Sequence, residues 1–161
     1  MKFAPIRTIV LLLAVFASAL TISPADATNA SGKWNLRGGD QLQVNAWHCG
    51  TYVSTCSWSS STKLLGSHPW RAIWIQNKAT LEAHGFRATL TISKKPGAIL
   101  DQTTRSMGTV RWTNFRAWIA DNSGEMSPSW TTAYVSTRSC GLAKVTKRIA
   151  VSEKCVYAGA F

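Results

Sequence analysis

The stretch that decides the fold runs from Ala79 to Lys94, ATLEAHGFRATLTISK. In its second half every other residue is apolar: Phe86, Ala88, Leu90 and Ile92. Successive side chains of a β-strand point to opposite faces, so this period of two predicts a half-buried strand with these four residues on the buried face.

A second strand-like run ends at His84-Gly85, so we predict a hairpin that turns at these two residues. Gly85 tolerates the positive φ that a tight turn requires. The hairpin registry places Glu82 opposite Arg87 on the solvent face, where an opposite-charge pair stabilises a sheet by roughly 0.2–1 kcal/mol. The alternative is a short helix from Asn77 to His84 that ends at Gly85.

The first 27 residues have the features of a secretory signal peptide. Lys2 and Arg7 precede an apolar run from Ile9 to Leu20, and Ala25-Asp26-Ala27 matches an A-x-A cleavage site. The apolar run, about a dozen residues, is too short for a membrane span. We therefore expect a secreted protein, extracellular or periplasmic; an uncleaved anchor is the alternative.

The expected mature chain, residues 28–161, is long enough for one domain with a sizeable core. Without Lys2, Arg7 and Asp26, 16 basic and six acidic residues remain, which gives a formal charge of +10. A positive field of this size attracts anionic polymers or surfaces. No later apolar run is long enough to span a membrane, so we expect a soluble mature protein.

All four cysteines lie in the expected mature chain: Cys49, Cys56, Cys140 and Cys155. Export implies an oxidising compartment, so we predict two disulfides. We favour Cys49–Cys56 with Cys140–Cys155, because each pair closes a short loop; two other connectivities are open. The spacings are not C-x₂-C, and His48 and His68 are poorly placed for a tetrahedral set, so no metal site is expected.

Other segments add strand and turn signals. Leu42, Val44 and Ala46 alternate with polar neighbours, which predicts a strand over 41–47. We interpret Ser57–Leu64 as a polar edge strand or a loop, and Trp70–Gln76 as a strand that is buried on both faces. We expect strands over Trp130–Thr137, Val145–Val151 and Lys154–Ala158 as well.

Three segments are predicted to be irregular. Residues 28–33 are small and polar, which is typical of a frayed terminus, and residues 94–104 have no clean period, which indicates a loop. The apolar parity changes within Thr109–Ala120, and a β-bulge near Thr113-Asn114 would explain that change. Asp121–Gly124 is predicted to be a turn. Many short strands and no helical period predict an all-β fold, a small antiparallel sandwich or barrel, as a single domain over 28–161.

The inventory of reactive residues does not favour an enzyme. The expected mature chain has six carboxylates and three histidines, without H-E-x-x-H, G-x-S-x-G or a glycine-rich phosphate loop. No catalytic residue and no cofactor is predicted. A small secreted hydrolase or nuclease is the third hypothesis for the function, since His48, His68 and Glu125 are groups that acid–base chemistry uses.

Three tryptophans fall off the apolar parity of their strands: Trp47, Trp74 and Trp118. A solvent-facing tryptophan offers a flat apolar platform and an N–H donor, and a nearby arginine adds charge recognition. We therefore predict binding roles for Trp47, Trp74, Arg111, Arg116 and Trp118. The alternative is that a covering loop or a bulge places each tryptophan in the core. Lys144, Lys147 and Arg148 form only a modest basic cluster.

These observations favour a secreted cationic binding domain. The expected partners are anionic or carbohydrate polymers of a cell envelope or matrix. The alternative is a protein-binding inhibitor or a toxin-like effector that recognises another extracellular protein through loops such as 49–56 or 94–104.

Overall fold

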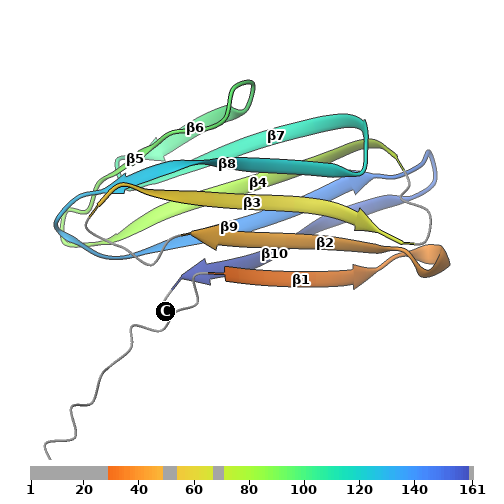
Figure 1. Ribbon diagram of the computed structural model, residues 1–161, viewed down its shortest axis with the longest axis horizontal. Coiled ribbons are helices and arrows are strands. Elements are labelled where there is room, and N and C mark those ends of the chain that lie inside the picture. The colour runs from red at the N-terminus through yellow and green to blue at the C-terminus, as the bar shows by residue number, and fades with distance from the viewer. Residues whose placement is uncertain (1–28, 49–53, 67–70, 160–161) are drawn as a thin grey trace, which may run out of the picture.

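The computed structural model describes residues 29–48, 54–66 and 71–159. They form two five-stranded antiparallel sheets that pack face to face as a β-sandwich (Figure 1). The predicted all-β fold is therefore confirmed, and its closure is a sandwich rather than a barrel. Over the described ranges, no helix has the length and apolar character that crossing a membrane requires.

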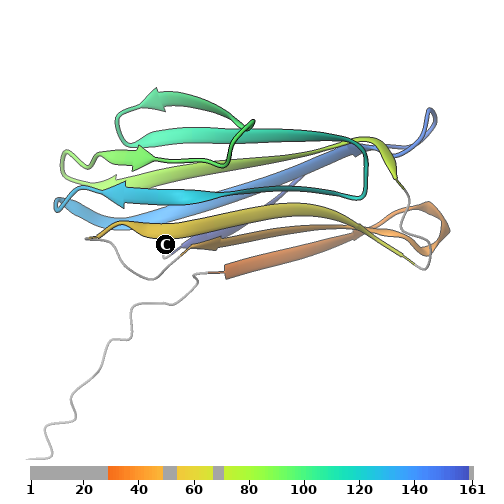
Figure 2. The same cartoon turned by 45° about the horizontal axis from the view of Figure 1, so that its top comes forward.

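Sheet A contains, in spatial order, β1 (Asn29–Asn35), β2 (Gln41–His48), β3 (Cys56–Leu65), β8 (Ile119–Pro128) and β5 (Leu90–Ile92). Sheet B contains β10 (Ala150–Gly159), β9 (Thr132–Lys144), β4 (Ala72–Gly85), β7 (Met107–Ala117) and β6 (Ile99–Thr104). A short 3-10 turn, η1 (Arg37–Gly39), joins β1 to β2. Figure 2 shows the two layers from a second angle.

Two apolar clusters fill the space between the sheets. One is centred on Trp58, Leu81, Leu90 and Met126, and the other on Leu42, Val44, Ile75 and Val145. The period-two pattern of β2 explains its share, since Leu42, Val44 and Ala46 are buried as predicted.

A buried polar network surrounds Asn77 on β4. The Asn77 amide donates to Thr62 Oγ1 at 3.1 Å and to Ser139 Oγ at 3.0 Å, and its carbonyl oxygen accepts from Ser60 Oγ at 2.5 Å. Asn122 Nδ2 donates to the same oxygen at 2.9 Å. Because a buried amide needs partners, this network links β3, β4, β8 and β9 in one registry.

The predicted hairpin at His84-Gly85 is wrong, and so is the helical alternative. β4 extends to Gly85 and pairs with β7 and β9 in sheet B, whereas β5 pairs with β8 in sheet A. Residues 86–89 therefore cross between the sheets. Leu90 and Ile92 are buried as expected, but Phe86 lies in the crossing turn and is 79% exposed.

The predicted bulge near Thr113-Asn114 is also wrong, because β7 (Met107–Ala117) pairs with β4 in one unbroken register. β7 ends at Ala117 in sheet B, and β8 begins at Ile119 in sheet A. The inward-facing parity stays the same across this crossing, because Val110 on β7 and Ala120 on β8 are both buried at even-numbered positions. The apparent change in the sequence comes from Phe115, which lies on the outward parity and faces solvent. Arg116 adopts a φ of 49°, in the left-handed region, at this sharp crossing.

Other expectations also fail where a polar sequence belongs to a strand. Asp121–Gly124 lies inside β8 rather than in a turn, and the expected frayed segment becomes β1 from Asn29 onward. The segment 57–64 is β3, which lies in the middle of sheet A rather than at an edge, and part of the expected loop over 94–104 is β6. Ile73 is exposed, so β4 is not buried on both faces.

The described residues contain one complete disulfide, Cys140–Cys155, which joins register partners on β9 and β10 and confirms that predicted pair. Cys56 is also disulfide-bonded. Cys49 lies outside the described residues, so the Cys49–Cys56 pair stays a prediction.

Candidate functional site

The five predicted binding residues do not form one site. Trp47 lies on the outer face of sheet A, 41% exposed, near the end of the sandwich where β2 stops. Arg111 lies midway along β7, in register with Lys78 on β4. Trp74, Arg116 and Trp118 lie at the opposite end of the sandwich from Trp47. The structure therefore brings three of the five to one end.

That end of the sandwich is where β1, β3, β7 and β9 stop and where β2, β4, β8 and β10 begin, on the right in Figure 1. It gathers six basic residues: Arg37, Arg71, Arg116, Lys144, Lys147 and Arg148. We call it the basic end. Three ion pairs are found among the described residues, Lys78–Glu153, His84–Glu82 and Lys95–Asp121, and none includes one of the six.

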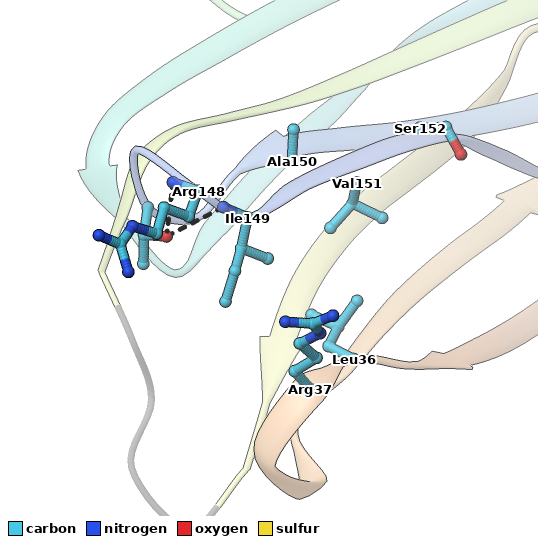
Figure 3. A pocket seen from close by; sticks show the side chains of 8 residues that line it. Leu36, Arg37, Arg148, Ile149, Ala150, Val151 and Ser152 are labelled. Carbon is cyan, nitrogen blue, oxygen red and sulfur yellow. Dashed lines mark hydrogen bonds between the residues drawn. The ribbon is translucent and has the colours of Figure 1, made fainter.

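A cleft of about 600 Å³ opens at the basic end, between η1 and the connection from β9 to β10. Figure 3 shows Leu36 and Arg37 on one wall, pointing toward Ile149 and Val151 on the other, with Arg148 at the rim. Apolar side chains thus lie on both walls, and two guanidinium groups belong to the lining. A volume of this size is within the range of small-molecule sites.

The wall that carries Arg37 is set by a tight turn. Gly38 and Gly39 adopt φ values of 85° and 86°, which glycine reaches without steric cost. The Leu36 N–H donates to the Asp40 carbonyl oxygen at 2.8 Å and closes the turn. Arg37 is therefore held at a fixed position beside the cleft.

The opposite wall is set by hydrogen bonds to Thr146. Its Oγ1 accepts from the N–H groups of Arg148 at 3.2 Å and Ile149 at 3.0 Å. The Val145 N–H donates to the Ile149 carbonyl oxygen at 2.9 Å. Both walls thus have local backbone constraints before any ligand arrives, which lowers the entropy cost of binding.

Among the described residues, the cleft lining contains Arg37 and Arg148 and no carboxylate. Asp40 lines a smaller pocket that shares Arg37 with the cleft. Guanidinium groups remain charged and form paired hydrogen bonds with carboxylate, sulfate or phosphate oxygens. The electrostatics of the cleft therefore favour an anion.

Aromatic side chains border the same end on the outer face of sheet B. Trp74 is in register with Phe115 on one side and with Lys144 on the other. Trp74 and Phe115 line an open hollow together with Gln76 and Thr113. Phe115 is 68% exposed, and Trp118 is 45% exposed. These rings offer stacking surfaces beside the basic groups.

The outer face of sheet A has a different chemistry around Trp47. A shallow groove of about 250 Å³ is lined there by Trp47, serines of β3 and β8, Lys63 and Asp121. Asn45 donates to Ser61 Oγ at 2.9 Å and accepts from Ser31 Oγ at 2.8 Å. Hydroxyl and amide groups dominate this face, and Lys95 pairs with Asp121 at 2.9 Å.

The remaining candidate groups for chemistry are engaged in the structure. Cys140, Glu153 and Cys155 lie together, but both sulfur atoms are in the disulfide and Glu153 pairs with Lys78. His84 stacks on Tyr134 with ring centroids 4.3 Å apart. His48 is buried on β2, and His68 lies outside the described residues.

The two arginines of the cleft were not predicted as site residues. Lys144, Lys147 and Arg148 form a visible cluster in the sequence, but nothing local indicates that Arg37 faces them. Arg37 and this cluster are more than a hundred positions apart in the sequence. They lie close in space because β1 and β10 are edge strands that pack against each other. Gly38-Gly39 after a basic residue is the one local signal, since it predicts a turn with an exposed arginine.

No protein-family model matches the chain, and no curated protein matches it. Among solved structures, the chain is similar to the collagen-binding domain from a Staphylococcus aureus adhesin. The sequence identity is 10%, the alignment covers 83% of this chain and 96% of that chain, and the TM-score is 0.38.

Proposed function

We propose that the chain is a secreted cationic binding domain that holds an anionic polymer at its basic end. The polymer class that fits is a polysaccharide with carboxylate, sulfate or phosphate groups. The observation that carries this proposal is the cleft in which Arg37 and Arg148 flank apolar side chains, without a carboxylate among the described residues of the lining. The signal-peptide features of residues 1–27 support the extracellular setting.

The strength of such binding comes from several contacts together. One solvent-exposed ion pair contributes about 0.2–1 kcal/mol, which is too little to hold a ligand alone. A polymer repeats its charge, so it can meet the two cleft arginines and the other four basic residues of this end at once. Exposed pairs are screened by salt, so the affinity should fall steeply with ionic strength.

The aromatic border supports a polymer made of rings. Trp74, Phe115 and Trp118 lie beside the basic groups, and a sugar ring can stack on such side chains. Charge then supplies attraction, and stacking supplies a preference for ring-containing polymers over simple anions.

The experiment is a pull-down of the mature protein on heparin-agarose and on an uncharged polysaccharide resin, at low and high salt. The native protein should bind heparin at low salt and be released at high salt. Arg37→Gln with Arg148→Gln should elute at distinctly lower salt. The charge-matched control is Lys94→Gln with Arg138→Gln, two exposed basic residues outside the basic end, which should elute with the native protein.

Equal losses in the two double variants would mean that net charge alone drives binding, and would reject the basic end as the site. Trp118→Ala tests the stacking part: it should weaken retention without changing its salt dependence, and the thermal midpoint should stay nearly unchanged. If Trp118 were core, the same variant would unfold early.

A second candidate is a neutral polysaccharide on the Trp47 face. Its groove combines an exposed tryptophan with hydroxyl and amide groups, which is a chemistry suited to sugars. Retention on the uncharged resin that resists salt and is lost in Trp47→Ala would favour this surface over the basic end.

A further inference from the structure

Two of the most exposed aromatic side chains lie together at the end of the sandwich opposite the basic end. Phe86 is 79% exposed in the crossing between β4 and β5, and Trp130 is 87% exposed in the turn between β8 and β9. Arg87 and Arg105 are exposed on the same group of turns. We call Phe86, Arg87, Arg105 and Trp130 the aromatic tip.

Hydrogen bonds hold the three turns of the aromatic tip together. The Ser129 N–H donates to the Thr89 carbonyl oxygen at 2.9 Å, and the Thr89 N–H donates to Ser129 Oγ at 3.0 Å. The third turn joins through the Leu90 N–H, which donates to the Arg105 carbonyl oxygen at 2.8 Å. The aromatic rings are therefore presented by a connected scaffold rather than by separate loops.

The backbone keeps the tip in a conformation that costs energy locally. Arg87 has a φ of 54°, in the left-handed region that non-glycine residues rarely adopt. The Arg87 guanidinium lies 5.4 Å from the centre of the Phe86 ring. Charge and aromatic surface are thus placed side by side and face solvent.

We infer that the aromatic tip docks on an anionic lipid surface, with Phe86 and Trp130 entering the interfacial region and Arg87 and Arg105 meeting the head groups. Tryptophan is favoured at membrane interfaces because its ring is apolar and its N–H is polar. The three turns, residues 86–89, 105–106 and 129–131, contain two arginines and no carboxylate. Their charge complements anionic head groups.

A lipid surface fits the shape of the tip better than a protein partner does. Stable protein interfaces bury about 800 Å² on each side, whereas the tip offers four side chains at the narrow end of the sandwich. Interfacial membrane binding needs only a small buried apolar area together with attraction to head groups.

The test uses the mature protein and sedimentation with vesicles of phosphatidylcholine mixed with phosphatidylglycerol, compared with phosphatidylcholine alone. The native protein should bind the anionic vesicles and bind the neutral ones much less. Phe86→Ser with Trp130→Ser should weaken binding about tenfold or more, because burying each ring contributes to transfer from water. Both side chains are largely exposed, so folding should be unaffected, which circular dichroism would check.

Phe115→Ser is the matched control, since it removes an exposed phenylalanine at the basic end. It should leave vesicle binding unchanged, whereas Arg87→Gln with Arg105→Gln should weaken it mainly on anionic vesicles. The inference is overturned if the native protein ignores anionic vesicles, or if Phe115→Ser costs as much as the tip variant. Native-like vesicle binding by Phe86→Ser with Trp130→Ser would also overturn it, and would leave the tip as a contact for a protein partner.

Discussion

At the scale of single residues, Phe86 and Leu90 have the same sequence parity but opposite environments. Leu90 is buried in an apolar cluster, so Leu90→Ala should lower the free energy of unfolding by about 2–5 kcal/mol through transfer and cavity terms. Phe86 faces solvent, so Phe86→Ala should change it by less than about 0.5 kcal/mol. Urea denaturation measures both, and equal costs would contradict the crossing between sheets.

The polar network gives a second prediction at this scale. Asn77 is fully buried with four side-chain partners, so Asn77→Ala should cost about 2–4 kcal/mol by leaving buried groups unpaired. Thr137 Oγ1 is buried without a hydrogen-bond partner among the described residues. Thr137→Val should therefore be neutral or stabilising by up to about 1 kcal/mol. Thermal unfolding compares the two, and a larger loss for Thr137→Val would refute this view of the network.

Residue patterns predict which face is buried more reliably than they predict a partner. The alternation of Leu42, Val44 and Ala46 was sufficient to identify the buried face of β2. The same alternation around Leu90 gave the right face but the wrong neighbour, because period two says nothing about which sheet a strand joins. The residue types of Asp121–Gly124 predict a turn, yet the hydrogen bond to Asn77 keeps Asn122 in the core.

At the scale of elements, most of the wrong predictions of secondary structure concern the places where strands begin and end. An apolar residue off the expected parity can indicate a bulge, or it can be an exposed side chain on an unbroken strand, and both leave the same local sequence pattern. In β7 the second explanation holds, because its register with β4 is unbroken and Phe115 is exposed. Polar strands such as β3 were ambiguous because the central polar network satisfies their inward hydroxyl groups, a long-range effect that no local window contains.

The disulfide gives a prediction at the scale of elements. Cys140–Cys155 joins β9 to the edge strand β10 across a separation of 15 residues. Cys140→Ser with Cys155→Ser should lower the free energy of unfolding by about 3 kcal/mol, as expected for a loop of this size. Denaturant unfolding measures the loss.

Peptide mapping of the native protein should recover Cys49 linked to Cys56, and any other partner would refute the local pairing.

At the scale of the whole molecule, the two proposed surfaces lie at opposite ends of one rigid sandwich. β4 has 14 residues, so at about 3.3 Å per residue it spans roughly 45 Å. The aromatic tip and the basic end are therefore far enough apart to be occupied together. The composition predicts the positive charge of the molecule. Only the topology shows that η1 lies opposite the β9–β10 connection, so local sequence patterns could not predict the cleft.

The most direct test of the central proposal is amide chemical-shift mapping of the isotope-labelled mature protein titrated with heparin oligosaccharides. The predicted result is a set of shifts centred on Leu36–Arg37 and on Thr146–Ser152, which weakens as salt is added. Shifts centred on Asn45, Trp47 and Ser59 instead, or no shifts at low salt, would contradict the assignment of the anionic polymer to the basic end.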